Sequence, residues 1–445
     1  MSNSYFGSVV NKALEFIKGG KIMDCFFHVF DMLNVYINYG KANEVKIQQR
    51  LLKRTLKYAY NNCNFYKNIA NKLHDKDDIN NYPIINKQVI IENFDSITSN
   101  KKDKMIYNIA STGGSSGEPL RFLNSNGIDD FYQYQLWKKF GFEKGDVILN
   151  MTGEKIDDES LKNNIFWKTR NNQDTSYGKY LLSSLYLNST NISIYCDYIV
   201  NLKPDFIRGY PSFIYEIADY ISKNNIDIGF NIKGIELTSE TSEKWQWDII
   251  SQVFKTKVFL QYGHTEGCVF AFSYDETMKL KVEPMYGYVE VLNENGKQVS
   301  EGEVGEVVVT TLRNNVMPFI RYNTGDLAEY GGFDGKYMIL NRIIGRTSNY
   351  IINEDNERIN LNPFISEHQA EAIKKIVKYQ FEQNRIGEVI IRIVKTKEYT
   401  NEDEKELRDL FKSGKFKCKF EYVEDIQKTN RGKQQLLIQN LKSVH

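Results

Sequence analysis

The chain has 445 residues, of which 41% are hydrophobic and 26% charged. A chain of this length can form two or three domains, each with its own hydrophobic core. The 58 basic and 57 acidic side chains leave no overall field that would attract a polyanion, so nucleic-acid binding is not expected. The five cysteines contain no C-x-x-C pair, which is typical of reduced thiols and excludes a disulfide framework or a cysteine zinc site.

The N-terminal region contains Lys12 and Lys18, but it has no uninterrupted apolar segment and no small-residue cleavage site. We therefore expect neither a signal peptide nor a transmembrane segment, and we expect a cytoplasmic protein. Residues 22–37 have a helical pattern with a narrow polar stripe among apolar side chains. This pattern fits a buried packing helix or, alternatively, a helix that contacts a partner or a membrane surface peripherally.

A segment of small and hydroxylated residues follows near position 110. It consists of Ser111, Thr112, Gly113, Gly114, Ser115, Ser116, Gly117, Glu118 and Pro119. Glycines let the backbone approach a ligand closely, and successive N–H groups and hydroxyls can donate hydrogen bonds to an anion. The segment therefore indicates a phosphate-binding loop.

Other loop types fit this segment less well. A Walker A motif requires Lys and then Ser or Thr after the last glycine, where Glu118 and Pro119 stand. A G-x-S-x-G nucleophile elbow requires a helix after the serine, and Pro119 and the strand-like residues 120–122 contradict that helix. An ordinary Gly/Ser surface turn remains the alternative to a phosphate loop.

The central and C-terminal regions alternate between helical and strand patterns. Residues 213–223 and 243–254 have helical periodicity, whereas residues 146–150 and 289–292 are short apolar strands. This alternation predicts an α/β fold. Residues 389–394 and 402–412 predict a strand and a helix in a small α+β domain at the C-terminus.

Four further motifs follow the loop in order. They are Gln-Tyr-Gly-His-Thr-Glu-Gly at 261–267, Arg-Tyr-Asn-Thr-Gly-Asp at 321–326, Ile-Ile-Gly-Arg-Thr-Ser at 343–348 and Lys-Thr-Asn-Arg-Gly-Lys at 428–433. With the loop, this series resembles the adenylate-forming (acyl-CoA synthetase) superfamily. Within it, the chain is similar to the phenylacetate-CoA ligase-like branch, which includes deazaflavin-coenzyme adenylylating synthetases and proteins of capsular polysaccharide biosynthesis. The resemblance covers most of the chain beyond the first ~50 residues.

The resemblance implies a division into domains. It implies a large multi-sheet adenylation domain at 1–345, with a helical region at 1–100, a hinge at 346–348 and a small α+β lid domain at 349–445. Many relatives carry an aspartate in the hinge where Ser348 stands here, and small polar residues can still absorb a change of backbone angles. We therefore expect a retained hinge. The sequence leaves the oligomeric state open, and a dimer is one alternative.

The resemblance also implies residues that bind ATP. Ser111, Thr112 and the glycine loop up to Gly117 would hold the β- and γ-phosphates. Tyr262 would stack on adenine, and Gly263 would admit the base. Asp326 would accept hydrogen bonds from the ribose hydroxyls, a task that suits a carboxylate with two oxygens. The adenine edge would be lined by Ser239 and Glu240.

Further residues carry the chemistry by the same resemblance. Glu266 would bind Mg²⁺ through a hard carboxylate oxygen, and Thr265 would lie near the α-phosphate. Arg346 would add positive charge near the ribose and phosphate, and Lys433 would neutralise charge between the carboxylate and the α-phosphate. His264 fits either a substrate contact or a structural histidine.

The implied function is ATP- and Mg²⁺-dependent activation of a carboxylic acid through an acyl-AMP, followed by transfer to coenzyme A. One alternative is an amide-forming ligase that acts on a polar or polysaccharide-related acid, and another is a nucleotide-binding pseudoenzyme. By the resemblance, the acid would lie near residues 208–212 and near the residues that flank 262–266. Tyr210, Phe213 and Phe270 are either lining or core aromatics. The acceptor is a thiol or an amine.

Overall fold

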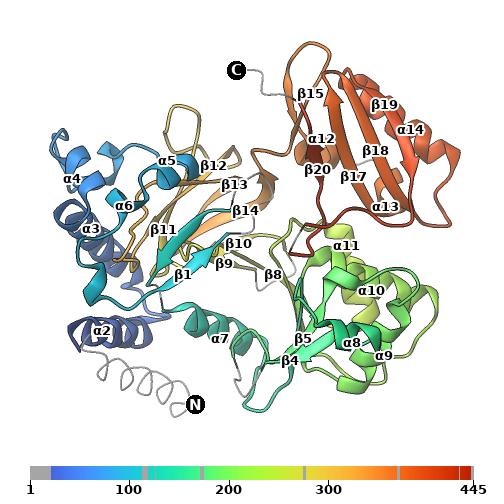
Figure 1. Cartoon of the computed structure of the whole chain (residues 1–445), viewed down its shortest axis with the longest axis horizontal. Coiled ribbons are helices and arrows are strands. Elements are labelled where there is room, and N and C mark those ends of the chain that lie inside the picture. Colours follow the sequence, from blue (N-terminus) through green and yellow to red (C-terminus); the bar gives the residue numbers. More distant parts are fainter. Residues whose placement is uncertain are drawn as a thin grey trace. The chain divides into compact units, whose positions relative to one another are not determined.

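The computed structural model describes residues 22–112, 119–125, 127–170, 175–273, 277–367, 371–429 and 431–441 (Figure 1). The predicted loop residues 113–117 lie outside these ranges. Contacts between residues divide the chain into two compact units: unit 1 joins Met1–Gly145 with Leu260–Ile343, and unit 2 joins Asp146–Phe259 with Ile344–His445. Each unit therefore combines two separate stretches of sequence. No helix in the described ranges has the length and apolar character needed to cross a membrane.

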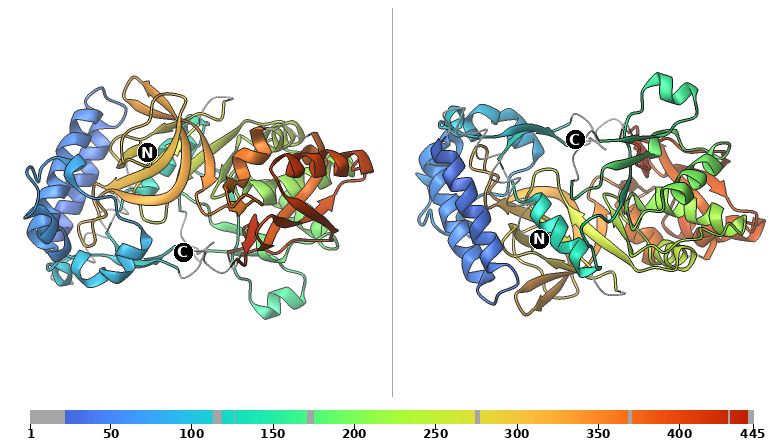
Figure 2. Two further views of the ribbon diagram at one scale, coloured as in Figure 1. Left: turned by 90° about the horizontal axis from the view of Figure 1, so that it is seen from above. Right: turned by 90° about the horizontal axis from the view of Figure 1, so that it is seen from below.

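Unit 1 begins with helices. Their bounds are α2 Ile22–Asn38, α3 Glu44–Asn62, α4 Asn64–Ala70, η1 Ile79–Asn81, α5 Lys87–Glu92, α6 Phe94–Ile97 and η2 Lys102–Lys104. Helix α3 contacts strands β11 (Gly287–Leu292) and β12 (Val304–Thr311), and Figure 2 shows it beside them. The contact forms because Leu52, Leu56 and Ala59 recur at helical spacing on one face and are buried.

The strands of unit 1 are mostly antiparallel. A hairpin of β1 (Asn108–Ser111) and β2 (Arg121–Asn124) flanks the glycine loop, with Ser111 paired to Arg121, and α7 (Asp129–Lys139) follows. The main sheet has the order β11-β12-β13-β14-β10-β9-β8. Its remaining strands are β8 Val258–Gly263, which enters from unit 2, β9 Phe270–Phe272, β10 Leu280–Val282, β13 Tyr322–Asp334 and β14 Tyr337–Arg346. Apolar strand residues such as Val307 and Val309 are completely buried in its core.

Unit 2 contains a largely parallel sheet in the order β7-β6-β3-β5-β4. Strands β5, β3, β6 and β7 run parallel, and β4 is antiparallel to β5. The bounds are β3 Ile148–Thr152, α8 Asp158–Lys162, β4 Trp167–Thr169, β5 Tyr180–Ser183, η3 Ser184–Tyr186, α9 Ile192–Leu202, β6 Phe206–Gly209, α10 Pro211–Lys223, β7 Gly234–Thr238 and α11 Lys244–Phe254. Because the four strands are parallel, their carboxyl ends share one edge of the sheet.

The C-terminal part of unit 2 has its own sheet, in the order β19-β18-β17-β20. Its elements are β15 Tyr350–Ile352, β16 Arg358–Asn360, α12 Leu361–Glu367, α13 Glu371–Lys374, β17 Ile376–Arg385, β18 Glu388–Lys395, α14 Asn401–Ser413, β19 Lys417–Tyr422 and β20 Leu437–Gln439. Phe381, Ile391, Leu407 and Phe411 belong to one buried cluster that holds α14 on the sheet (Figure 1). The predicted strand at 389–394 and helix at 402–412 fall within β18 and α14, and the predicted α/β fold is confirmed.

Candidate functional site

Several of the predicted site residues lie in two clusters, one in each unit. The first, the carboxylate cluster of unit 1, consists of Tyr262, His264, Glu266, Tyr322 and Asp326. The second, the strand-end cluster of unit 2, brings the ends of parallel strands together with residues 428–434 of the C-terminal part.

Asp326 is the centre of the carboxylate cluster. The Tyr262 hydroxyl donates to Asp326 Oδ2 at 2.9 Å, and His264 Nε2 lies 2.8 Å from the same oxygen. The Tyr262 and His264 rings meet edge to face, with centroids 4.9 Å apart. Asp326 is 6% exposed, so two side chains and burial together fix its carboxylate.

The structure gives His264 a structural contact, because one ring nitrogen lies against Asp326. The other, Nδ1, is buried and has no hydrogen-bond partner among the described residues. The sequence is compatible with either a structural role or a substrate contact for His264. The Nε2 contact accounts for the first role, and a substrate contact stays a prediction.

Glu266 lies in the turn after β8. Its side chain is buried, and the Tyr322 hydroxyl donates to its Oε1 at 3.3 Å. Gly267 has a φ of 66° and donates its N–H to the His264 carbonyl at 3.0 Å, which closes the turn and leaves Thr265 exposed. A carboxylate oxygen is the ligand type that Mg²⁺ prefers, so Glu266 fits the predicted metal role.

Gly263 ends β8 at a crowded position. A Cβ atom there would lie 2.6 Å from Gln261 Nε2 and 3.2 Å from the Val269 carbonyl oxygen. The glycine therefore has a packing reason in this strand.

Near the glycine loop, Thr112 Oγ1 accepts a hydrogen bond from the Leu120 N–H at 3.1 Å, which holds the base of the loop together.

Lys433 is the cation of the strand-end cluster. Its Nζ donates to the Ser239 carbonyl at 2.9 Å and lies 5.6 Å from the centroid of the Tyr210 ring. Ser239 directly follows β7, and Tyr210 directly follows β6. Lys433 thus lies at the carboxyl edge of the parallel sheet, which is where ligands bind in open α/β sheets.

Glu240 joins the same edge to the C-terminal part. Its Oε2 accepts from the Ser212 N–H at 3.2 Å and from the Ser212 Oγ at 2.7 Å, and its Oε1 accepts from the Gln434 N–H at 2.9 Å. Burial raises the pKa of Glu240 above its ordinary value, although the Ser212 hydrogen bonds act in the opposite direction. The observed contacts give Glu240 a connecting role, and its place at the adenine edge stays a prediction.

Further contacts fix residues 431–432 against the strand ends. The Tyr210 hydroxyl donates to the Arg431 carbonyl at 3.1 Å, and Ser184 Oγ donates to the Gly432 carbonyl at 3.0 Å. A Cβ on Gly153 would lie 1.6 Å from the Arg431 oxygen. Ser184 and Gly153 carry no motif that would identify them, because their partners are distant in sequence.

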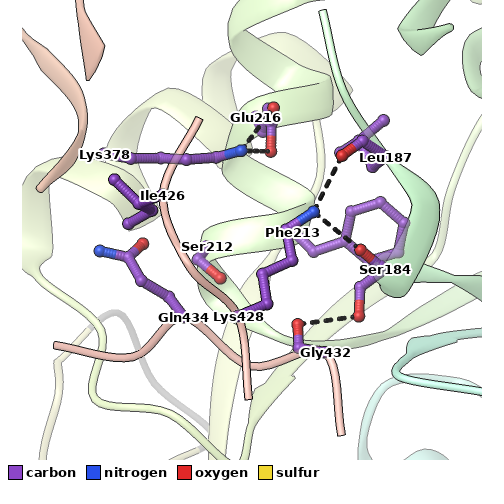
Figure 3. A pocket seen from close by; sticks show the side chains of 10 residues that line it. All are labelled: Ser184, Leu187, Ser212, Phe213, Glu216, Lys378, Ile426, Lys428, Gly432 and Gln434. Atoms are coloured by element: carbon purple, nitrogen blue, oxygen red, sulfur yellow. Dashed lines mark hydrogen bonds and ion pairs between the residues drawn. The ribbon is translucent and has the colours of Figure 1, made fainter. Parts of the chain in front are cut away.

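A small pocket lies behind this contact (Figure 3). It is lined by Ser184, Leu187, Ser212, Phe213, Glu216, Lys378, Ile426, Lys428, Gly432 and Gln434. Lys428 Nζ donates to the Ser184 and Leu187 carbonyls at 2.9 Å each, and burial lowers the pKa of Lys428. Lys378 Nζ lies 2.8 Å from a Glu216 carboxylate oxygen and 2.8 Å from Asp425 Oδ1. These lysines therefore connect the C-terminal part to η3 and α10.

The predicted hinge is also held by hydrogen bonds. The Arg346 carbonyl accepts from the Asn349 N–H and from Asn360 Nδ2, each at 3.1 Å. Gly345 has a φ of 131°, and a Cβ there would lie 1.9 Å from Asn362 Nδ2. The backbone before Arg346 therefore requires glycine. Movement about 346–348 stays a prediction.

The predicted acid-binding segment has partners of its own. Arg208 Nε lies 2.9 Å from Glu236 Oε1, and its guanidinium lies 4.7 Å from the Tyr177 ring centroid. Phe213 is buried and meets Tyr195 edge to face, with centroids 5.9 Å apart. These contacts favour structural roles for Arg208 and Phe213.

Phe270 in unit 1 is a core aromatic in the described structure. It is 3% exposed and its ring lies 5.7 Å from Tyr132 and 5.6 Å from Tyr286. Cys268 is completely buried, and burial raises the pKa of its thiol. Both residues therefore pack in the core of unit 1.

Known proteins resemble this chain in sequence. The family model of the CapK C-terminal domain matches residues 351–440. Over 426 residues the chain is 27% identical to Protein CapK of Staphylococcus aureus, with 89% of each chain covered. It is 23% identical over 369 residues to the phenylacetate-coenzyme A ligase of Escherichia coli (strain K12), with 77% of this chain and 79% of the ligase covered.

Solved structures resemble the chain in fold. A 2-hydroxyisobutyryl-CoA ligase in the postadenylation state, in complex with 2-HIB-AMP, matches with a TM-score of 0.65 at 15% identity, covering 88% of this chain and 89% of that one. An acyl acid amido synthetase matches with a TM-score of 0.56 at 15% identity, covering 86% and 87%. The similarities confirm the fold and the predicted resemblance to the adenylate-forming ligases and their phenylacetate-CoA ligase-like branch.

Proposed function

We propose that this chain, which resembles the adenylate-forming ligases over most of its length, activates a carboxylic acid with ATP and transfers the acyl group to coenzyme A. The observation that carries the proposal is the position of Lys433. Lys433 donates to the carbonyl that follows β7, at the carboxyl edge of a parallel sheet. Ligands of open α/β sheets bind at this edge, so the position suits a lysine that acts on a bound substrate.

In the first reaction, a carboxylate oxygen of the acid attacks the α-phosphorus of ATP. The bond between that phosphorus and the bridging oxygen breaks, and pyrophosphate leaves. Negative charge accumulates at phosphorus and at the incoming oxygen, and a fixed cation lowers the energy of this arrangement. Lys433 supplies that cation in our proposal, and Arg346 adds positive charge near the ribose and phosphate.

The carboxylate cluster binds the nucleoside. Asp326 accepts the ribose hydroxyls, and its orientation is set in advance by Tyr262 and His264. A carboxylate that is already oriented loses little entropy when it binds a ligand. Tyr262 offers an aromatic face to adenine, and Gly263 leaves room for the base.

Glu266 holds Mg²⁺ in this proposal. Its buried carboxylate has a defined orientation because Tyr322 donates to one of its oxygens. When bound, the metal ion would offset negative charge on the phosphates. A Glu266→Ala variant is therefore expected to need more Mg²⁺ for the same rate of adenylation.

In the second reaction, the thiol sulfur of coenzyme A attacks the acyl carbon, AMP leaves with its electron pair, and the thiol gives up its proton. The C-terminal lid rotates about 346–348 between the two reactions. This movement requires the release of the bonds from Lys433, Gln434 and Lys378 to residues 146–259. All of these bonds are hydrogen bonds or ion pairs, which water can replace.

The test is acid-dependent exchange of labelled pyrophosphate into ATP across a panel of aryl, aliphatic, amino and uronic acids. Exchange with one class would establish acyl-AMP formation and name the substrate class, because the assay does not depend on the acceptor. A panel without exchange, from a protein that binds ATP, would contradict the proposal for these acids and favour a nucleotide-binding pseudoenzyme.

The acceptor is tested with the acid that supports exchange. Stoichiometric release of AMP with coenzyme A, and formation of the thioester, would establish thiol transfer. AMP release with an amine alone would identify an amide-forming ligase instead. The same protein preparation serves both assays, so the two outcomes are directly comparable.

A further inference from the structure

The surface of α2 carries exposed apolar side chains. Phe30 is 68% exposed and Ile37 is 56% exposed, and Leu33 lies between them at 36%. The three residues follow at helical spacing and therefore lie on one face of α2. Val35, on the opposite face, is 1% exposed. The described half of α2 therefore carries apolar side chains both on its buried side and on the side that faces solvent.

The neighbouring helix α3 carries a basic stripe. Lys46, Arg50, Lys53 and Lys57 are spaced by four, three and four positions, and all are exposed. This spacing places them on one face, opposite the buried Thr55 and Ala59. The one acidic residue of α3, Glu44, is buried and pairs with Lys336 at 2.7 Å. No acidic side chain of α3 therefore offsets the stripe.

An ion pair fixes the two helices to each other. Arg54 of α3 donates to both carboxylate oxygens of Asp31 on α2, at 2.8 and 2.7 Å. Tyr39, just after α2, packs edge to face on Phe131 of α7, with centroids 5.4 Å apart. Both helices therefore lie against the core of unit 1, and the apolar and basic faces turn away from it. Figure 2 shows α2 and α3 as neighbours at this side of unit 1.

We propose that these two faces, which we term the α2–α3 surface, bind the surface of a membrane that contains anionic lipids. Aromatic and branched side chains enter the boundary between headgroups and acyl chains, and lysine and arginine side chains contact the lipid phosphates. The combination of an apolar face with a basic stripe identifies the ligand. A nucleic acid would use the basic stripe but not the apolar face, and a second copy would bring two basic stripes together, which is unfavourable.

The α2–α3 surface shares no residue with either cluster that we assign to catalysis. Its proposed role is to hold the enzyme at a lipid surface, so that an acid or acceptor attached to lipid is presented to it. The binding is peripheral, because no helix in the described ranges can cross a membrane.

The experiment is sedimentation of the full chain with vesicles of phosphatidylcholine alone and of phosphatidylcholine mixed with phosphatidylserine. We expect binding only to the mixed vesicles, and weaker binding as salt is raised. Replacing Lys46, Arg50, Lys53 and Lys57 by Gln is expected to weaken binding by at least about tenfold, since each basic residue contributes to attraction by anionic lipid. A Phe30→Ser/Ile37→Ser variant is expected to weaken it by a similar factor.

The matched control replaces Lys72, Lys144, Lys397 and Lys405 by Gln. These lysines are also exposed, so the control loses the same charge elsewhere on the chain and should bind as the unchanged protein does. Pyrophosphate exchange and thermal unfolding verify that each variant is folded.

Three results would overturn the proposal. The first is an unchanged protein that binds neither kind of vesicle, and the second is equal weakening in the control variant. The third is a dimer in solution that Phe30→Ser/Ile37→Ser converts to a monomer without any vesicle binding, which would assign the surface to a second copy.

Discussion

The carboxylate cluster and the strand-end cluster hold their charged groups in different ways. In the carboxylate cluster, side chains bond to side chains on strands of one unit, and Tyr262 and Asp326 are 64 positions apart. In the strand-end cluster, Lys433 bonds to a backbone carbonyl 194 positions away, and backbone carbonyls of Arg431 and Gly432 accept the neighbouring bonds. The first cluster is built into a sheet, whereas the second forms only when the C-terminal part lies on the strand ends.

This difference between the two clusters predicts that one affects mainly the binding of ATP and the other mainly the rate of the reaction. Groups that are fixed before the ligand arrives contribute to affinity, because they need no rearrangement. Groups that arrive with a separate segment act when that segment is in place, so they contribute to the step that the segment completes. Changes in the carboxylate cluster should therefore alter mainly the KM for ATP, and changes in the strand-end cluster should alter mainly kcat.

The largest expected effect comes from Lys433→Ala. Loss of a fixed charge at the reacting phosphorus should lower the rate of pyrophosphate exchange by about 100- to 1,000-fold, with nucleotide binding retained. Exchange of labelled pyrophosphate and equilibrium binding of ATP measure the two quantities separately. Lys419→Ala is the control, because Lys419 is exposed and pairs only locally with Glu421. A raised Kd for ATP with an unchanged rate would remove Lys433 from the chemical step.

Asp326→Asn should produce the opposite pattern. The variant keeps the shape of the side chain but loses the charge that accepts two ribose hydroxyls, so the KM for ATP should rise about 10- to 100-fold. Asp334→Asn at the end of the same strand is the control, since Asp334 is exposed and pairs with Lys281. If kcat fell while the KM for ATP stayed constant, the division between the two clusters would be wrong.

Local pattern was sufficient to predict much of the fold. Periodicity placed α10, α11 and α14 within a few residues, and short apolar runs located β3 and β18, because these elements bury one regular face. The motifs also brought Tyr262 and Asp326 into the site together. The motif at 261–267 begins inside a strand, since residues 262–263 belong to β8, which pairs with β9.

Tertiary contacts could not be predicted in the same way. Gly153 and Ser184 stand in unremarkable sequence, and only the fold shows that they contact Arg431 and Gly432. Likewise, the apolar pattern at 22–37 was compatible with a buried or an exposed helix, and the exposure of Phe30 is decided by what packs beside α2. A single sequence contains no signal for such neighbours.

A pair of glycine variants tests how closely residues 431–433 must fit the strand ends. Gly432 has a φ of 70°, and a Cβ there would lie 2.3 Å from Ser184 Oγ and 2.9 Å from Gly153 Cα. Gly229 has a similar φ of 68°, with no atom within 4 Å of its Cβ position. Both alanine variants lose about 1 kcal/mol through backbone strain. Only Gly432→Ala should also lower kcat, by about tenfold, because it displaces Lys433. Equal kcat values in the two variants would mean that this fit is not needed.

The smallest expected effect concerns the free energy of unfolding. It tests whether the buried carboxyl group of Glu283 is charged in the folded core of unit 1. Burial raises the pKa of Glu283 from 4.5 to about 7, and the Tyr39 hydroxyl donates to its Oε1 at 3.0 Å. A raised carboxyl pKa contributes stability that is complete below the unfolded pKa and is lost as pH rises through the folded pKa.

The unchanged protein should therefore lose about 1 kcal/mol of unfolding free energy relative to Glu283→Gln between about pH 6 and about pH 8. Urea unfolding at both pH values measures this difference, and Asp129, whose pKa burial raises to about 6, contributes equally to both proteins. Glu294→Gln, at an exposed position, should show no such dependence. A constant difference between the unchanged protein and Glu283→Gln would mean that Glu283 keeps its charge in the core, paired with nearby lysines such as Lys139. The fixed geometry of unit 1 would then rest on ion pairing, as it does around Lys378 in unit 2.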